Sequence, residues 1–198
     1  MKLTKKAQQS EATKQKLLQG VEKILAEEGF MALKVENISR VSGVDKKLIY
    51  FHFEDLNGLL TAFLKSKDFW FTKVYTDMPP VFNKEVAKLV FANQLNTING
   101  NKLLTQLLVW ELSDKNEVLK KMSQERDEAG TVLIEQLVNA EGFKEDVQPL
   151  LALLVAGIYY LSIHSINNGS TFCGMDLTKK EDTERLHATL ASLIDKIQ

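Results

Sequence analysis

The sequence predicts an all-α protein of about nine helices, and three observations lead to this fold class. Apolar residues recur at spacings of three and four along nearly the whole chain of 198 residues. Strict alternation of apolar and polar residues, the pattern of half-buried strands, is nearly absent. With 44% apolar residues, the chain is able to bury a substantial hydrophobic core.

Residues that begin and end helices divide the first 80 residues into four helical segments. Gly29 and Gly43 are helix stops, and Asp45 is an N-cap whose carboxylate accepts from the first free N–H groups. Pro79 and Pro80 end the fourth segment. The predicted helices cover 10–28, 35–42, the stretch from just after Asp45 to Phe53, and 56–75.

Longer helices are predicted after Pro80. The turn at Asn99 and Gly100 separates two of them, and Gly142 and Gly169 end two others. The last helix starts at Thr178, which fits a capping box with the glutamate three positions later. The predicted helices cover 81–98, 102–112, 114–141, 146–168 and 179–197.

Composition and termini predict a cytoplasmic protein outside the membrane. Cys173 is the single cysteine and has no partner for an internal disulfide. The basic start is followed by polar residues and not by the apolar core of a signal peptide. The long, nearly uncharged run 149–168 contains Ser162 and His164, which favours a buried or interface helix over a membrane span.

Charge is almost balanced over the whole chain but not at its start. Lys and Arg number 25 and Asp and Glu 26, yet the first 23 residues contain six lysines and two glutamates. A second basic pair, Lys46 and Lys47, opens the third predicted helix. Such lysines suit contact with phosphate, and they equally suit a solvated surface that keeps the protein soluble.

The two short helices on either side of Gly43 have the sequence pattern of a helix-turn-helix. In that motif the second helix presents its N-terminal residues to the major groove of DNA, which is wide enough to admit a helix. Asp45, Lys46, Lys47 and Phe51 are expected to face outward. The expected buried side consists of Val35, Ile38, Val41, Val44, Leu48 and Ile49.

Residues from about 12 to 60 resemble the DNA-binding domain of tetracycline-repressor (TetR) family regulators. The resemblance is carried by Glu28-Gly29-Phe30, Val35-x-x-Ile38, Ser42-Gly43-Val44, Ile49-Tyr50-Phe51-His52-Phe53 and Leu59-Leu60. It implies a DNA-binding domain over 1–55 and a helical effector-binding and dimerisation domain over 56–198. It also implies that Tyr50 and His52 contact the DNA backbone. The candidate DNA-binding residues are Lys34, Asp45, Lys46, Lys47, Tyr50, Phe51 and His52.

Three positions depart from the family pattern. Lys34 stands where the family usually has a Ser or Thr cap. Asp45 and Lys47 replace the usual Ser and the frequent Gly at the start of the recognition helix. Leu56 stands in the place of a lysine that often contacts the backbone. We expect these changes to alter the operator sequence more than the class of function.

The resemblance also implies a homodimer and a small-molecule effector. We expect the dimer to form through residues 146–168 and 179–197, because the first of these helices is apolar nearly all round. Two recognition helices are then held for the two halves of a palindromic operator. The candidate pocket residues are Trp70, Phe91, Gln94, Leu95, Gln106, Trp110 and Glu111. Among them, Glu111 would favour a cationic ligand.

No sequence pattern supports catalysis, a cofactor or a metal site. The three histidines lie far apart, and neither a Gly-x-Ser-x-Gly motif nor a phosphate-binding glycine loop is present. The predicted function is a one-component regulator, a repressor in the first instance and an activator as the nearest variant. The alternative is a helical small-molecule-binding or enzymatic protein in which residues 34–53 form only a structural corner.

Overall fold

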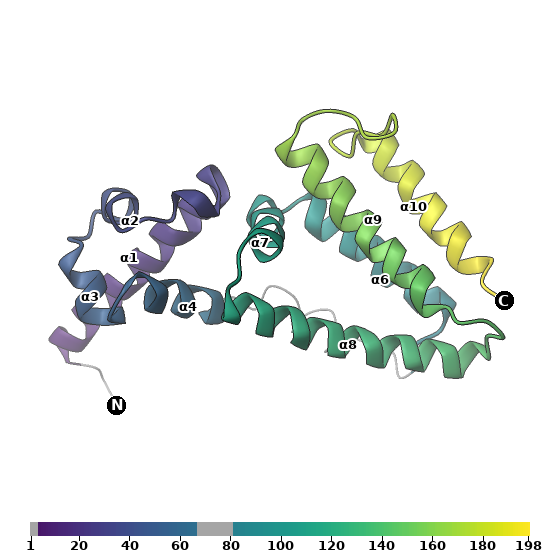
Figure 1. Cartoon of the computed structure of the whole chain (residues 1–198), viewed down its shortest axis with the longest axis horizontal. Helices are drawn as coiled ribbons and strands as arrows, with labels where there is room; N and C mark the ends of the chain where they lie inside the picture. Colours follow the sequence, from purple (N-terminus) through teal and green to yellow (C-terminus); the bar gives the residue numbers. More distant parts are fainter. Residues whose placement is uncertain (1–3, 67–80) are drawn as a thin grey trace. The chain divides into compact units, whose positions relative to one another are not determined.

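The structure is a computed structural model that describes residues 4–66 and 81–198. Within these ranges all long elements are α-helices, accompanied by one short 3-10 helix and an isolated bridge between Phe172 and Met175. The all-α prediction is confirmed. The chain divides into two compact units, Met1–Asp68 with Trp110–Leu119 and Phe69–Val109 with Lys120–Gln198, and each is described by itself (Figure 1).

The first unit begins with α1 (Lys5–Glu28), which starts more than a turn before the predicted Ser10. The reason is Thr4, whose Oγ1 accepts a hydrogen bond from the N–H of Ala7 at 3.4 Å and so caps the helix earlier. The helix ends at Gly29 as predicted, with φ at 82°. Its buried face consists of Leu17, Gly20, Val21, Ile24 and Leu25.

A 3-10 helix (Phe30–Ala32) leads into α2 (Val35–Ser42) and α3 (Lys47–Phe53), which agree with the predicted pair of short helices. Gly43 ends α2 in the left-handed region at φ 66°, where a residue without a Cβ is favoured. The Asp45 carboxylate accepts from the N–H of Lys47 at 2.8 Å, as predicted. Ile38 and Ile49 are fully buried and join the two helices to the rest of the unit.

Helix α4 (Leu56–Ser66) packs against α1 and α3 and completes the core of the first unit with Leu59 and Phe63. The Asp55 carboxylate accepts from the N–H of Gly58 at 2.7 Å in the first turn. The prediction of one helix over 56–75 agrees with the structure up to Ser66, and the rest of that range lies outside the described residues. The functional boundary between 55 and 56 stays a prediction.

The turn between α3 and α4 requires a glycine at position 58. A Cβ at Gly58 would overlap the carbonyl oxygen of Phe53, a backbone atom that cannot move aside like a flexible side chain. We expect Gly58→Ala to destabilise the first unit by about 3 kcal/mol, because overpacking forces a backbone shift. The matched control is Gly130→Ala within α8, where a Cβ would meet nothing within 4 Å.

Glycine in a helix interior costs conformational entropy, so the control is expected to stabilise the protein by about 0.5–1 kcal/mol. Urea unfolding followed by circular dichroism measures both variants. Equal stability of the Gly58→Ala and Gly130→Ala proteins would contradict this account of the α3–α4 turn.

The remaining helices are α6 (Lys84–Asn99), α7 (Lys102–Ser113), α8 (Glu117–Glu141), α9 (Gln148–Asn167) and α10 (Lys180–Asp195). Helices α6 and α8 begin three residues later than predicted, because asparagine side chains cap them. The Oδ1 of Asn83 accepts from a first-turn N–H of α6 at 3.0 Å, and the Oδ1 of Asn116 accepts from one of α8 at 2.9 Å. Asp114, the predicted start of α8, instead accepts from the indole N–H of Trp110 at 3.0 Å.

The predicted capping box at the start of α10 is wrong, because Thr178 serves the preceding loop. Its hydroxyl and its N–H donate to the Asp176 carboxylate at 2.6 and 3.1 Å. These two bonds lower the pKa of Asp176 below its ordinary value, since they stabilise the charged form. The Asp182 carboxylate in turn accepts from the N–H of Asp176 at 2.9 Å and ties the loop to α10.

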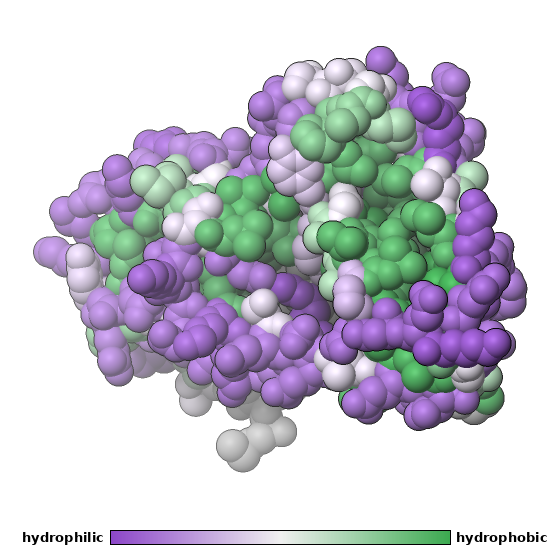
Figure 2. All heavy atoms as spheres, turned by 45° about the vertical axis from the view of Figure 1, so that its right-hand side comes forward, coloured by the Kyte–Doolittle hydropathy of each residue, from purple (hydrophilic) through white to green (hydrophobic). Residues whose placement is uncertain are grey.

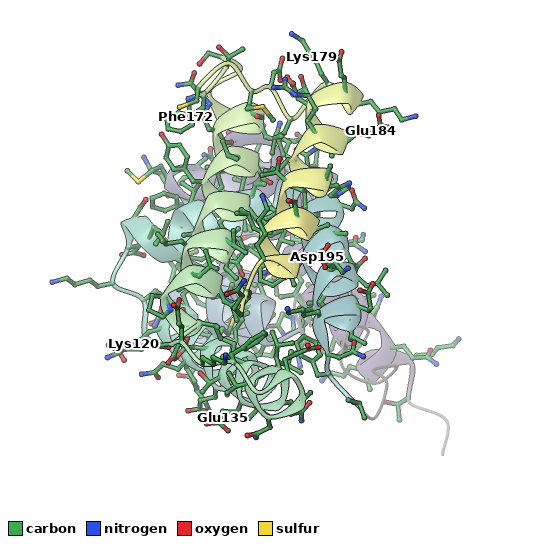
Figure 3. All side chains as sticks on the ribbon, turned by 90° about the vertical axis from the view of Figure 1, so that its right-hand side faces the viewer. Lys120, Glu135, Phe172, Lys179, Glu184 and Asp195 are labelled. Carbon is green, nitrogen blue, oxygen red and sulfur yellow. The ribbon has the colours of Figure 1, made fainter. Side chains whose placement is uncertain are left out.

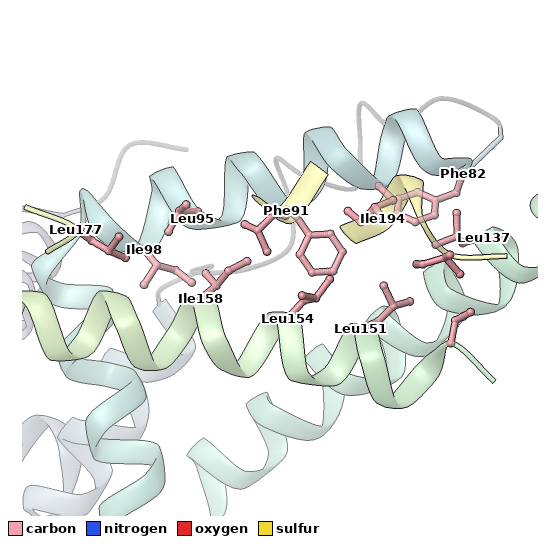
Figure 4. Close-up of a cluster of buried hydrophobic side chains, with 14 of the residues drawn as sticks. Phe82, Phe91, Leu95, Ile98, Leu137, Leu151, Leu154, Ile158, Leu177 and Ile194 are labelled. Carbon is pink, nitrogen blue, oxygen red and sulfur yellow. The ribbon is translucent and has the colours of Figure 1, made fainter. Parts of the chain in front are cut away.

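The core of the second unit lies among α6, α9 and α10, with further side chains from α8 (Figure 4). Views from two directions show α9 and α10 side by side (Figures 1 and 3). The core consists of apolar residues that recur at the helical spacing seen in the sequence. Its members include Phe91, Leu95, Ile98, Leu154, Ile158 and Ile194.

Helix α9 is long and apolar enough, by length and composition alone, to cross a membrane, with a mean hydropathy of 1.7. Its inner face belongs to the core of the second unit through Leu151, Leu154 and Ile158. Two serines are buried on it as well, and the hydroxyl of Ser165 accepts from the N–H of Leu177 at 3.0 Å. The apolar inner face of α9 therefore has a place in the protein core.

Candidate nucleic-acid interface and candidate pocket

Helix α3 presents most of the predicted DNA-binding residues on one exposed surface. Asp45, Lys46 and Lys47 are exposed, and Tyr50 and Phe51 are 52% and 78% exposed. Two adjacent exposed aromatic side chains beside two lysines mark this surface as a candidate interaction site. Lys34 is exposed too, at the N-cap of α2, and its side chain makes no capping bond, as the sequence indicated.

His52 is half-buried beside two aromatic rings of the same helix. Its ring meets the edges of Phe51 and Phe53, with centroid separations of 4.9 and 6.3 Å. These contacts fix the direction of the imidazole at the C-terminal end of α3. One expectation for this helix is wrong: Leu48 is 36% exposed, because Ile49 alone supplies the buried face of α3.

A cavity of about 460 Å³ lies in the second unit among α6, α8 and α9. Its walls are mostly apolar, and a few polar side chains interrupt them, which is the usual composition of a small-molecule pocket. Apolar wall residues include Phe82, Phe91, Ile134, Leu137, Leu151 and Val155. Polar wall residues include Asn93, Gln94, Thr97, Thr131, Gln148 and Tyr159.

Two polar contacts join residues of different helices that line this cavity. The amide of Gln94 on α6 donates to the hydroxyl of Tyr159 on α9 at 3.1 Å. The guanidinium of Arg126 on α8 lies over the ring of the same tyrosine, 5.9 Å from its centroid. Arg126 also donates to the hydroxyl of Ser123 at 3.2 Å.

The structure brings two of the predicted pocket residues together, Phe91 and Gln94, in the wall of this cavity. Leu95 is fully buried in the core and does not line the cavity. Gln106 donates to the side chain of Asn167. Glu111 does not line the cavity either, and Trp70 lies outside the described residues.

Trp110 belongs to the first unit, where it serves packing. Its ring stacks on Phe30 with a centroid separation of 6.2 Å and an interplanar angle of 8°.

Sequence reasoning also missed the pocket residues Arg126 and Tyr159. Arg126 lies in a helix rich in charged residues, where no pattern sets it apart from the solvent-facing ones.

The outer face of α9 forms an apolar surface that the protomer leaves exposed. Leu153 is 70% exposed and Tyr160 52%, and Phe172 of the following loop lies against Tyr160 with centroids 4.9 Å apart. Figure 2 shows apolar side chains gathered on the surface of this unit, and Figure 3 places Phe172 beside α9. Exposed patches of this kind mark interaction sites.

Most apolar residues of α10 do not reach this surface. Leu190 and Ile194 of α10, and Ile197 just after it, are buried within the protomer, although the range 179–197 was predicted to form part of the dimer contact. Exposed positions of α10 carry Ala188, Thr189 and other small or polar residues.

In the described ranges 4–66 and 81–198, no group of three or more His, Cys, Asp or Glu side chains is arranged to hold a metal ion.

Comparisons with known proteins support the fold. No protein-family model and no curated protein matches the sequence. Among solved structures, a Rhodococcus protein described as a TetR-family transcriptional regulator superposes with a TM-score of 0.63 at 18% identity, over 94% of this chain and 98% of its own.

Two further structures are similar to this chain. The FadR regulator of Bacillus subtilis, solved with stearoyl-CoA, has a TM-score of 0.61 at 17% identity, over 92% of this chain and 97% of its own. NalD of Pseudomonas aeruginosa, the secondary repressor of a multidrug efflux pump, has a TM-score of 0.57 at 17% identity, over 92% of this chain and 95% of its own. The chain therefore has the fold of these transcriptional regulators.

Proposed function

We propose that the protein is a one-component transcriptional regulator, a repressor that binds a palindromic operator as a homodimer and leaves it when a small molecule binds. The observation that carries this proposal is the surface of α3. A short helix that follows a left-handed glycine turn presents Lys46, Lys47, Tyr50 and Phe51 to the outside. A surface with these donors and cations fits the edges of bases and the phosphates of a major groove.

In this proposal the exposed residues of the first unit have different roles. Lys46 and Lys47 at the start of α3 reach base edges and phosphate, while Tyr50 and His52 at its end contact the backbone. Lys34 at the start of α2 adds a phosphate contact. Because a lysine–phosphate contact releases counterions, DNA binding should weaken steeply as salt rises.

The second unit supplies the effector site and the dimer contact. The cavity among α6, α8 and α9 has the size and apolar walls of a small-molecule pocket. The exposed face of α9 with Leu153 and Tyr160 supplies a self-complementary surface for a two-fold dimer. A protein that binds chromosomal DNA and a diffusible effector works in the cytoplasm, and this function requires neither a catalytic residue nor a cofactor.

Substitutions of Asp45 test how charge on the proposed DNA surface affects DNA binding. Its carboxylate caps α3 through Lys47 and also places a negative charge beside the phosphates. We expect Asp45→Asn to raise the affinity for random DNA several-fold with little change in stability, because asparagine caps as well but carries no charge. Asp45→Ala should lose about 1 kcal/mol of stability with the cap.

Chemical unfolding and fluorescence-anisotropy titrations of duplex DNA measure these two effects. If Asp45→Asn instead weakens binding to the preferred sequence alone, the carboxylate accepts from a base and the assignment of Asp45 as a structural cap is overturned.

The experiment that tests the proposed function is selection of genomic fragments by the purified protein. A regulator should enrich a few fragments that share a palindrome, with half-sites about one helical turn apart. A chain that binds only small molecules enriches none, and that outcome favours the alternative in which residues 34–53 form a structural corner.

A further inference from the structure

The charged groups of the cavity are placed unequally. Arg126 is the one Lys or Arg among the described residues that line it, and Asp127 is the one Asp or Glu. Asp127 is exposed, while Arg126 is half-buried and its Nη1 is shielded from solvent. Of these two charged residues, which both line the cavity, the positive one is therefore the more buried.

Neighbouring side chains hold Arg126 in this position. Its Nη2 donates to Ser123 one turn earlier on α8, and the guanidinium carbon lies 5.9 Å from the centroid of the Tyr159 ring. Arg126 shares its face of α8 with Gly130, Leu133 and Leu137, which also line the cavity. These contacts hold the guanidinium in a mostly apolar wall.

A fixed guanidinium in such a wall favours a ligand group that is planar and anionic. Arg binds a carboxylate through two parallel N–H···O bonds, and such charge-assisted bonds are stronger where water is excluded. The apolar walls from α6, α8 and α9 favour an apolar body for the same ligand. A cavity of about 460 Å³ holds roughly 15–20 non-hydrogen atoms at protein packing density.

We propose that the effector is an amphipathic carboxylate, with its anionic group on Arg126 and its apolar body along Phe91, Ile134 and Val155. This inference rests on the proposed function, since it names the ligand class of that pocket. It reverses the preference for a cation that Glu111 suggested, because Glu111 does not line the cavity. Gln94 and Tyr159, which are hydrogen-bonded to each other and both line the cavity, give the pocket a second polar site.

Three ligands with one chain and different head groups test the proposal: decanoate, decan-1-ol and decylammonium. Isothermal titration of the full-length protein should give decanoate an affinity at least tenfold higher than either of the others. Arg126→Gln should lose that tenfold advantage and leave decan-1-ol unchanged, while Arg126→Lys should keep part of it. The matched control is Lys121→Gln on the same helix, whose cation is 76% exposed and does not line the cavity.

Equal affinities for the three head groups, or an Arg126→Gln protein that binds decanoate like the wild type, would overturn the proposal. If Arg126→Gln does not fold by circular dichroism, the wild-type head-group series and Arg126→Lys still decide. DNA binding is measured in parallel on the same preparations. Arg126-dependent decanoate binding without sequence-preferring DNA binding refutes the proposed function alone, and the reverse result refutes the ligand class alone.

Discussion

Replacing Tyr50 and His52 together by alanine is expected to weaken DNA binding by roughly 100-fold, on the operator and on random DNA alike. Tyr50 is exposed on α3, and His52 is held beside it by Phe51 and Phe53. Two lost hydrogen bonds to charged phosphate correspond to about 3 kcal/mol, and backbone contacts carry no sequence information. Anisotropy titrations with both duplexes measure the effect.

Two comparisons make this experiment specific to α3. Met31→Ala removes a side chain that is 75% exposed in the same unit but lies outside α3, so it should leave affinity unchanged. Lys46→Ala or Lys47→Ala should change the preferred base as well as the affinity. A Tyr50→Ala, His52→Ala protein that binds both duplexes as the wild type does would refute the assignment of the DNA surface.

The second large effect is expected from Leu153→Glu on the exposed face of α9. If this face joins two copies, the substitution buries an unpaired carboxylate from each protomer, and the dimer should dissociate at micromolar concentration. Each monomer then binds one half-site, so operator affinity should fall at least 100-fold. Light scattering measures the mass, and anisotropy measures the affinity.

The chain offers a matched control for this substitution on α6. Leu89 is 70% exposed, as Leu153 is, and lies in the same unit. Leu89→Glu should therefore leave both the mass and the operator affinity as they are. A Leu153→Glu protein that stays dimeric and keeps its operator affinity would remove α9 from the proposed interface.

The sequence predicted best those parts of the fold that local interactions determine. The bounds of α2 and the start of α3 depend on Gly43 and Asp45, which act within a few residues of their own positions. Where two polar residues compete for one helix end, the sequence does not choose between them. Thr4 rather than Ser10 caps α1, and Asn116 rather than Asp114 caps α8.

The pocket was predicted less well because it depends on how helices are rotated against one another. Phe91 and Gln94 line the cavity, and Phe91 also belongs to the core, whereas Leu95, one position after Gln94, is buried in the core and does not line the cavity. Trp110 packs on Phe30, which is 80 positions away in the sequence and carries no local sign of the contact. Helical periodicity shows which residues share a face and does not show what that face meets.

The same reason explains the interface prediction. Apolar residues of α10 such as Leu190 and Ile194 recur at a helical spacing that suits packing against a partner subunit or within the protomer's own core. In the structure they are buried in the core. Leu153 on α9 is as hydrophobic as the leucines of α10 but remains exposed. The sequence predicted an apolar helix, and only the folded protomer distinguishes its inner face from its outer one.

The most direct test of the central claim compares the affinity of the purified wild-type protein for its selected duplex and for a shuffled duplex of the same composition. A transcriptional regulator should bind the selected duplex at least 1,000-fold more tightly at physiological salt, with both affinities falling steeply as salt rises. Equal affinities for the two duplexes, or the absence of binding to both at low salt, would contradict the proposal that this protein is a DNA-binding regulator.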